Sequence, residues 1–168
     1  MKLGIFSVMD FHPEQQGSAA GFYREMIELA VKAEKLSYDS VWVAEHHFAN
    51  YGLCPSPPVL LAAIAQKTEQ IRTRYCETRA VGNAKTFDQL MQQRLIAVGD
   101  PDHVTDILQQ LASFGVERVL CLMNFGGMPF RMVSESLTLT AREVMPRVAS
   151  CVKPNPEGDT RHINRRAT

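Results

Sequence analysis

The order of hydrophobic and polar positions along the chain predicts strands that alternate with helices. Short apolar runs, typical of strands buried on both faces, occupy residues 3–9, 40–44 and 116–123. The first run is followed over residues 20–36 by apolar side chains at helical spacing, among them Phe22, Met26 and Leu29. Strand, helix and strand in this order indicate a crossover unit, so the pattern predicts an α/β fold with parallel strands.

Further helices have recognisable start signals. Ser56 stands before Pro57 and Pro58, which predicts a helix continuing over residues 59–68 with Ser56 as its N-cap. Asp100 followed by Pro101 predicts a second start, and that helix should end at Gly115. A last amphipathic helix follows over residues 133–148, with its regularity broken near Pro146.

The middle of the chain has a weaker pattern. Strand-forming residues alternate with charges over residues 71–85, which favours an edge strand or an irregular connection. Thr86 and Gln89 have capping-box spacing before a short helix that should reach Arg94. The run at residues 116–123 is the longest apolar β-like run, so it is predicted to be the central strand of the sheet. Four aromatic residues belong to apolar patterns and are expected in the core: Phe6, Trp42, Phe48 and Phe114.

Composition narrows the classes of partner. The chain has 168 residues, 45% of them hydrophobic, which suits one domain over residues 1–152 followed by a polar tail, residues 153–168, that we expect to be disordered. Eighteen basic residues balance eighteen acidic ones, so the charge gives no reason to expect binding to nucleic acid or to a membrane. The four cysteines lie far apart and form no disulfide or zinc pattern, which indicates reduced thiols and a cytoplasmic protein.

Candidate chemistry gathers where the predicted strands end. Asp10 follows the first strand, Glu45, His46 and His47 follow the second, and Asn124-Phe125-Gly126-Gly127 follows the last. Parallel strands share one carboxyl edge, so these three groups should converge there. A simpler interpretation remains for each: the two glycines form a turn, and the adjacent histidines point to opposite sides. A metal site is disfavoured because two adjacent histidines and a carboxylate lack a spaced third ligand.

Several segments resemble one known family, the bacterial luciferase-like, flavin-dependent monooxygenases. The matching segments are Lys2-Leu3-Gly4-Ile5-Phe6, Ala33-Glu34-Lys35-Leu36, Val41-Trp42-Val43-Ala44-Glu45-His46-His47-Phe48, Val98-Gly99-Asp100-Pro101-Asp102-His103-Val104, Phe114-Gly115-Val116, Asn124-Phe125-Gly126-Gly127 and Ala141-Arg142-Glu143-Val144-Met145-Pro146. The resemblance implies a (β/α)8 barrel. A barrel of that kind takes at least about 200 residues, and residues 71–95 stand where several central units would be. We therefore expect a truncated TIM-barrel-like arc with about four parallel strands.

The resemblance also implies an activity. Members of the family use reduced FMN and oxygen, with a flavin reductase as partner, to oxygenate a small organic substrate beside a strand-end histidine. By this resemblance His46 or His47 handles the proton, Glu45 orients it, and Asp10 and residues 124–127 contact the cofactor. The family's phosphate-binding loops belong to later central strands, and no counterpart of them is found in this sequence.

The shortened barrel raises two further expectations. An arc exposes two strand edges and an apolar inner face, so we expect a homodimer, which either packs arc against arc into a barrel-like body or covers the inner faces with residues 73–95. The alternative to an enzyme is a non-catalytic remnant that binds a flavin, another small molecule or a protein partner. An inactive fragment held together by self-association is the third possibility.

Overall fold

Four parallel strands form the centre of the protein. The computed structural model describes residues 1–45, 52–77 and 96–149, with residues 75–77 described in their backbone alone. The strands β1 (Lys2–Ser7), β2 (Ser40–Glu45), β3 (Arg72–Glu77) and β4 (Arg118–Asn124) form one sheet in the order β3-β2-β1-β4. Every neighbouring pair is parallel, as the sequence predicted. His46, His47, Phe48, the short helix predicted up to Arg94 and the polar tail lie outside the described residues.

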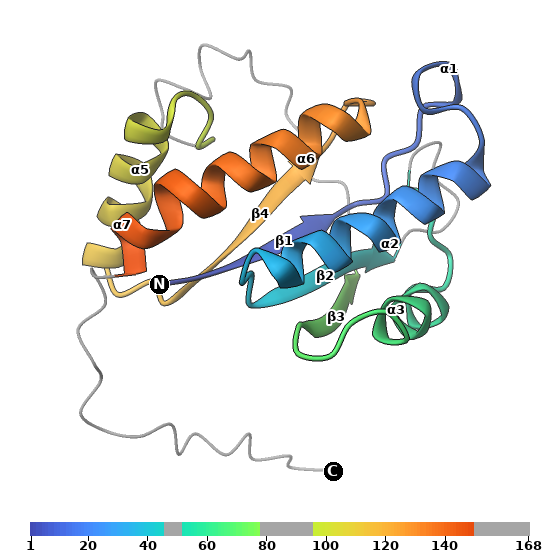
Figure 1. Ribbon diagram of the computed structural model, residues 1–168, viewed down its shortest axis with the longest axis horizontal. Helices are drawn as coiled ribbons and strands as arrows, with labels where there is room; N and C mark the ends of the chain where they lie inside the picture. The colour runs from blue at the N-terminus through green and yellow to red at the C-terminus, as the bar shows by residue number, and fades with distance from the viewer. Residues whose placement is uncertain (46–51, 78–95, 150–168) are drawn as a thin grey trace.

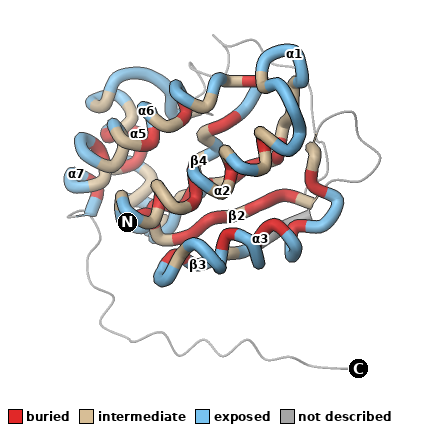
Figure 2. The backbone as a smooth tube through the Cα atoms, turned by 45° about the vertical axis from the view of Figure 1, so that its right-hand side comes forward, coloured by how far each residue is buried: buried red, intermediate tan, exposed pale blue. Residues whose placement is uncertain are grey.

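The helices cover one side of this sheet. Figure 1 shows α2 (Ala19–Lys35) and α6 (Phe130–Leu139) on the same side of the strands, and Figure 2 shows α3 (Pro57–Ala65) on that side beside β2. The helix α5 (Pro101–Ser113) packs against η1 (Thr140–Val144) and α7 (Met145–Ala149). The described residues also include the short helix α1 (Pro13–Gln16). Helices on one side of parallel strands form an arc of (β/α) units, the truncated barrel that the sequence predicted.

Strand register divides the side chains between the two faces of the sheet. Ile5 pairs with Val41 and with Cys121, and this row faces the helices, where Ile5 and Val41 are buried. The adjacent row runs across all four strands on the opposite face: Arg74, Trp42, Phe6 and Leu122. The helices α2, α3 and α6 lie on the other side of the sheet from this second row (Figures 1 and 2). We call the side that carries the second row the open face.

The two predicted helix starts in the described ranges are confirmed, because α3 begins directly after Ser56 and α5 directly after Asp100; only the side-chain bond expected from Ser56 is not formed. Ser18 and Asp100 accept the backbone N–H groups of Gly21 and His103, at 3.1 and 2.8 Å. Ser56 makes no such bond. Pro58 occupies the second helical position and has no N–H to offer, and the N–H of Val59 is bonded to the backbone carbonyl of Ser56 itself.

Two expectations about the core are also wrong. The strand predicted as central, now β4, is an edge strand, and its Leu120 and Leu122 are 37% and 40% exposed on the open face. Strands of a barrel carry hydrophobic side chains on both faces, which explains the long apolar run of β4. In the described structure, helices cover only one of these two faces (Figures 1 and 2). Phe114 lies at the C-cap of α5 and is 75% exposed, whereas Phe6 and Trp42 lie half-buried on the open face.

The last helical region confirms the irregularity predicted near Pro146. A wide π turn, η1, separates α6 from α7, and the N–H of Met145 bonds to the carbonyl of Thr140 five residues earlier. Tyr38 reaches this region from the start of β2, and its hydroxyl donates to the Leu137 carbonyl at 3.0 Å.

In the described ranges, no helix combines the length and the apolar content needed to cross a bilayer.

Candidate functional site

The ends of β1 and β4 are joined through Asp10. Its Oδ2 accepts the backbone N–H of Gly126 at 2.7 Å, and its Oδ1 lies 3.0 Å from Nε2 of His12. The predicted convergence of these two strand ends is therefore found. The Asp10 side chain is only 15% exposed, and both of its oxygens are engaged within the protein. Asp10 thus fixes the loop after β4 in place.

The two glycines of that loop adopt conformations that favour glycine. Gly126 has φ +61° and Gly127 has φ +71°, both in the left-handed region. A Cβ atom on Gly127 would lie 1.9 Å from Oε1 of Gln15 and 3.2 Å from Cβ of His12. Gly127 therefore allows the loop after β4 to approach the segment after β1 closely. Phe125, between the strand and the glycines, is 48% exposed at this edge.

Asn124 points away from the open face. A bulge between β1 and β4 pairs Phe6 with Leu122 but Ser7 with Asn124, so one residue of β4 is extra. Asn124 consequently faces the helix side with Ser7, and its Nδ2 donates to Sδ of Met26 at 3.2 Å. The side chain is 6% exposed. Without the bulge, regular alternation along β4 would place Asn124 on the open face with Leu122. The sequence pattern does not reveal the bulge, so it could not predict the direction of this side chain.

The second strand ends at the same edge. Glu45 is the last residue of β2 and is partly buried; it takes part in interactions of its own within the protein. His46 and His47 fall outside the described residues, so their predicted roles are left as predictions. Leu53, just beyond that gap, donates its N–H to the Met9 carbonyl at 2.8 Å and accepts the hydroxyl of Tyr23 through its own carbonyl. Burial, together with the adjacent Cys54 thiol, raises the pKa of Tyr23 to about 12.

His12 is the one titratable residue at this edge that sequence reasoning missed. Its imidazole lies against Asp10, and its backbone N–H donates to Oε1 of Gln16 at 2.7 Å. A carboxylate that orients a histidine is the arrangement of many proton-transferring sites. The signal was present in the sequence as an aspartate at a strand end with a histidine two residues later.

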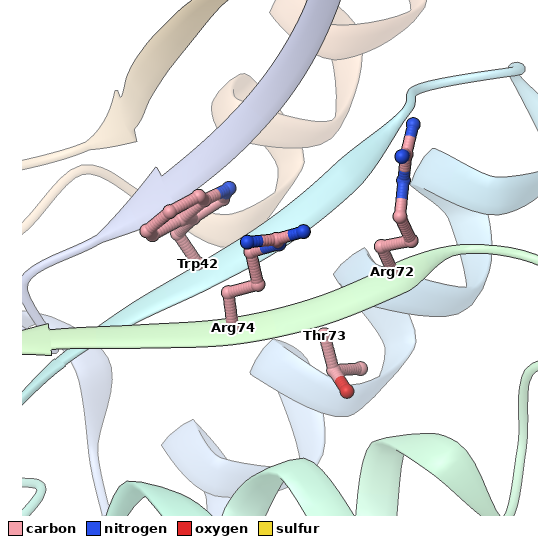
Figure 3. A pocket seen from close by; sticks show the side chains of 4 residues that line it. All are labelled: Trp42, Arg72, Thr73 and Arg74. Atoms are coloured by element: carbon pink, nitrogen blue, oxygen red, sulfur yellow. The ribbon is translucent and has the colours of Figure 1, made fainter. Parts of the chain in front are cut away.

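A separate depression lies on the open face, away from this edge. It has a volume of ≈ 490 Å³ and is lined by Trp42, Arg72, Thr73 and Arg74. Figure 3 shows Trp42 and the two arginines on one side of β2 and β3, with Thr73 pointing to the other. Among the described residues, no group of three or more histidine, cysteine, aspartate or glutamate side chains is placed to hold a metal ion.

Comparison with known proteins gives sequence matches in the first part of the chain. Residues 1–76 match the family model described as luciferase-like monooxygenase. YwcH of Bacillus subtilis, described as uncharacterized, is 42% identical over 67 residues, which are 39% of this chain and 20% of that protein. The oxygenase component of flavin-dependent trigonelline monooxygenase from Acinetobacter baylyi is 33% identical over 72 residues, 43% of this chain and 20% of that one.

A solved structure resembles a longer part of the chain more loosely. The oxygenating constituent of 3,6-diketocamphane monooxygenase from Pseudomonas putida, in complex with FMN, aligns with 90% of this chain and 37% of its own, at 18% identity and a TM-score of 0.42. The matches to the two curated relatives each span 20% of the relative's length. The similarity of this chain to luciferase-like monooxygenases is therefore carried by residues 1–76, which are less than half of its length.

Proposed function

We propose that the chain is a flavin-dependent monooxygenase of reduced activity, which uses reduced FMN and oxygen to oxygenate a small organic substrate. The observation that carries the proposal is the Asp10–Gly126 hydrogen bond, which joins the carboxyl ends of β1 and β4 where barrel enzymes have their active sites. The match of residues 1–76 to the luciferase-like monooxygenase family model supports the proposal. The relative from Acinetobacter baylyi is named as an oxygenase component, which favours a flavin reductase as partner here too.

The described residues at this edge fit a flavin only in part. Phe125 offers a half-exposed ring on which a flat heterocycle can stack. A phosphate needs cationic or unengaged N–H donors. The side chains placed around the Gly126–Gly127 turn are Asp10, His12 and Gln15, none of which carries a permanent positive charge, and the Gly126 N–H is already bonded. The ring of FMN is thus matched here and its phosphate is not.

In this proposal the protein's own groups supply the proton chemistry. His46 or His47 transfers a proton near neutral pH, since an imidazole titrates close to it, and Glu45 orients that imidazole. Asp10 and the backbone of residues 124–127 shape the floor on which the ring lies, with Asp10 acting through the Gly126 N–H. Variants His46→Ala and His47→Ala should lose oxygenation of substrate. His103→Ala, at an exposed position in the first turn of α5, is the matched control and should keep it.

A titration with two flavins tests the proposal. Riboflavin has the ring of FMN without the phosphate, so both should bind saturably, under anaerobic reduction, with dissociation constants within about threefold of each other. If FMN bound more than about thirtyfold tighter than riboflavin, the protein would have groups that bind the phosphate, and the fit to the flavin ring alone would be contradicted. Failure of both flavins to bind would contradict the enzyme and favour the alternative.

The alternative is a non-catalytic, luciferase-like remnant that binds a flavin, another small molecule or a protein partner. The cations of the depression on the open face favour it, because they lie away from the strand ends. For either function we propose a homodimer that uses the outer edges of β3 and β4, which pair with no strand in the described sheet. Sedimentation should give twice the chain's mass of 18.8 kDa, and a stable monomer at micromolar concentration would contradict the dimer.

A further inference from the structure

We infer that the open face of the sheet binds a small monoanion with a flat or elongated apolar body, an aryl or alkyl carboxylate, at Arg74 and Trp42. The inference does not depend on the flavin chemistry proposed above. It rests on a row of side chains across β1, β2, β3 and β4, and on a charge and a depression at β2 and β3, whose lining residues Figure 3 shows.

The charge is the first part of the argument. Two arginines line the depression, but Arg72 is bonded to the Asp39 carboxylate at the start of β2. No carboxylate in the described ranges pairs with Arg74, whose guanidinium carbon lies 5.6 Å from the centre of the Trp42 ring. One cation without an acidic partner matches one negative charge. A guanidinium also presents two parallel N–H groups to a carboxylate, which selects for that geometry.

The apolar row is the second part. Trp42 is in register with Arg74 on one side and with Phe6 on the other, and Phe6 is in register with Leu122. Neighbouring strands lie about 4.8 Å apart, so the three apolar residues stand at roughly 5, 10 and 14 Å from the position of the cation along the row. Leu122 is 40% exposed, and Phe6 and Trp42 are half-buried. A ligand with its anion at Arg74 can lay an apolar body across these side chains and remove them from water.

The polar groups of the row limit the class of ligand further. The indole N–H of Trp42 already donates to Oγ of Ser40 at 3.1 Å, so the ring offers an apolar surface and no hydrogen bond. Sugars and other polyols need several donors and acceptors, which this row lacks. A phosphate dianion needs more than one uncompensated cation, and Arg72 is compensated by Asp39. The volume of ≈ 490 Å³ suits a small molecule rather than a polymer.

The test uses the chain's single tryptophan, which is Trp42 itself. The probe is 2-naphthoate, and 2-naphthamide is its neutral counterpart of the same shape. Binding is followed by quenching of Trp42 emission and by equilibrium dialysis, with the molar mass measured on the same samples. We expect saturable binding of naphthoate, at least about tenfold tighter than binding of naphthamide.

Variants of one residue separate charge from shape. Arg74→Gln should weaken naphthoate binding at least about tenfold and change the dissociation constant of naphthamide by less than about twofold. Arg74→Lys keeps the charge without the paired N–H groups, so its affinity for naphthoate should lie between those of the natural chain and Arg74→Gln. Arg131→Gln removes an exposed arginine on α6 and should change neither ligand. Leu122→Asp places a negative charge at the end of the row farthest from Arg74, so it should also weaken the binding of naphthoate. Arg74 and Leu122 are exposed, so these variants should fold; circular dichroism checks this.

Four results would overturn the inference. One is equal binding of naphthoate and naphthamide, and another is unchanged naphthoate binding by Arg74→Gln. The third is displacement of naphthoate by millimolar inorganic phosphate, which would assign the site to a phosphate ligand. A dimer that binds no naphthoate would likewise refute it, because the open face would then be the contact between copies.

Discussion

Asp10 and Gly126 stand 116 positions apart in the sequence and are joined by a 2.7 Å hydrogen bond from the Gly126 N–H to Oδ2 of Asp10. The bond links the ends of the first and last strands of the sheet, which are neighbours in it. It also places His12 and the Gly126–Gly127 turn on either side of one carboxylate. The candidate site therefore depends on a contact between two segments far apart in the sequence and not on one local motif.

Removing that carboxylate should loosen the turn. Asp10→Ala is expected to lower the free energy of unfolding by about 1–2 kcal/mol, since a charged acceptor and its contact with His12 are lost together. Amide hydrogen exchange at Gly126 should become faster, while Asp10→Asn, which keeps an oxygen acceptor, should lose less. Glu14→Ala on the exposed surface of α1 is the control. Unchanged exchange at Gly126 in Asp10→Ala would show that the bond does not hold the loop.

The two glycines of the turn should differ in their tolerance of alanine. A Cβ on Gly126 meets nothing within 4 Å, so Gly126→Ala carries only the strain of its positive φ, about 1 kcal/mol. Gly127→Ala carries the same strain and also displaces the Gln15 side chain. It should therefore cost more, and the double variant with Gln15→Ala should recover part of the difference. Urea unfolding of the four proteins measures this, and equal losses for both glycines would contradict the close approach of Gln15.

Most of the fold follows from periodicity in the sequence. The helix predicted over residues 20–36 is α2, Ala19–Lys35, and the strand predicted over residues 40–44 is β2, Ser40–Glu45, each correct to within one residue. The alternation of charge that disfavoured a central strand near Thr73 correctly indicated an edge, because β3 ends the sheet. These features are local, and local periodicity is what a sequence shows most directly.

The errors come from features that periodicity does not encode. The position of β4 at an edge depends on which strands are present, and its apolar run cannot distinguish a covered face from an open one. The direction of Asn124 depends on one extra residue in the strand pairing. His12 was missed because the sequence does not show that its imidazole folds back against Asp10, while Gly126 bonds to the other oxygen of that carboxylate.

The opposite edge of the sheet is held by one acidic residue. Asp39 lies near three basic side chains, from β1, β3 and β4: its Oδ2 is 3.1 Å from Nε of Arg118 and its Oδ1 is 3.8 Å from Nζ of Lys2, while Arg72 bonds to the same carboxylate. Its own side chain is 11% exposed. Asp39→Asn should lower the free energy of unfolding by about 1 kcal/mol at low salt, and by less in 1 M salt, where charges are screened within about 3 Å.

The matched control for Asp39 is an isolated pair on the surface. Arg131 and Glu135 lie 3.1 Å apart on α6, with side chains 86% and 63% exposed. Glu135→Gln should change stability by less than about 0.5 kcal/mol at any salt concentration. If the two variants lose the same stability, the three strands gain nothing from sharing one carboxylate at Asp39.

Cys121 should be the least reactive thiol of the described part of the chain. Burial on the helix side of β4 raises its pKa to about 11, so about one molecule in a thousand carries the thiolate at pH 8. Iodoacetamide should label it only when the protein is unfolded by urea, and peptide mass spectrometry resolves the sites. Rapid labelling of Cys121 in the folded protein would show that β4 opens readily at its edge.

Glu34 connects the end of α2 to the chain that leads into β3, and its contribution to stability should depend on pH. Its Oε1 accepts the backbone N–H groups of Gln70, Ile71 and Glu69 at 2.6, 2.9 and 2.9 Å. The bonds from Gln70 and Ile71 lower the pKa of Glu34 most, and that from Glu69 lowers it further. The unfolded chain has no such bonds, so its Glu34 keeps the ordinary pKa of 4.5.

A carboxyl group with a lowered pKa in the folded state stabilises the protein fully above its ordinary pKa and loses that effect as the pH falls through the folded-state value. Glu34→Gln should therefore be less stable than the natural chain at about pH 7, and the gap should close by about pH 3. Thermal melts across this range measure it, with Glu28→Gln on an exposed face of α2 as the control. A gap that stays constant with pH would mean that the three N–H groups are held equally well by a neutral amide.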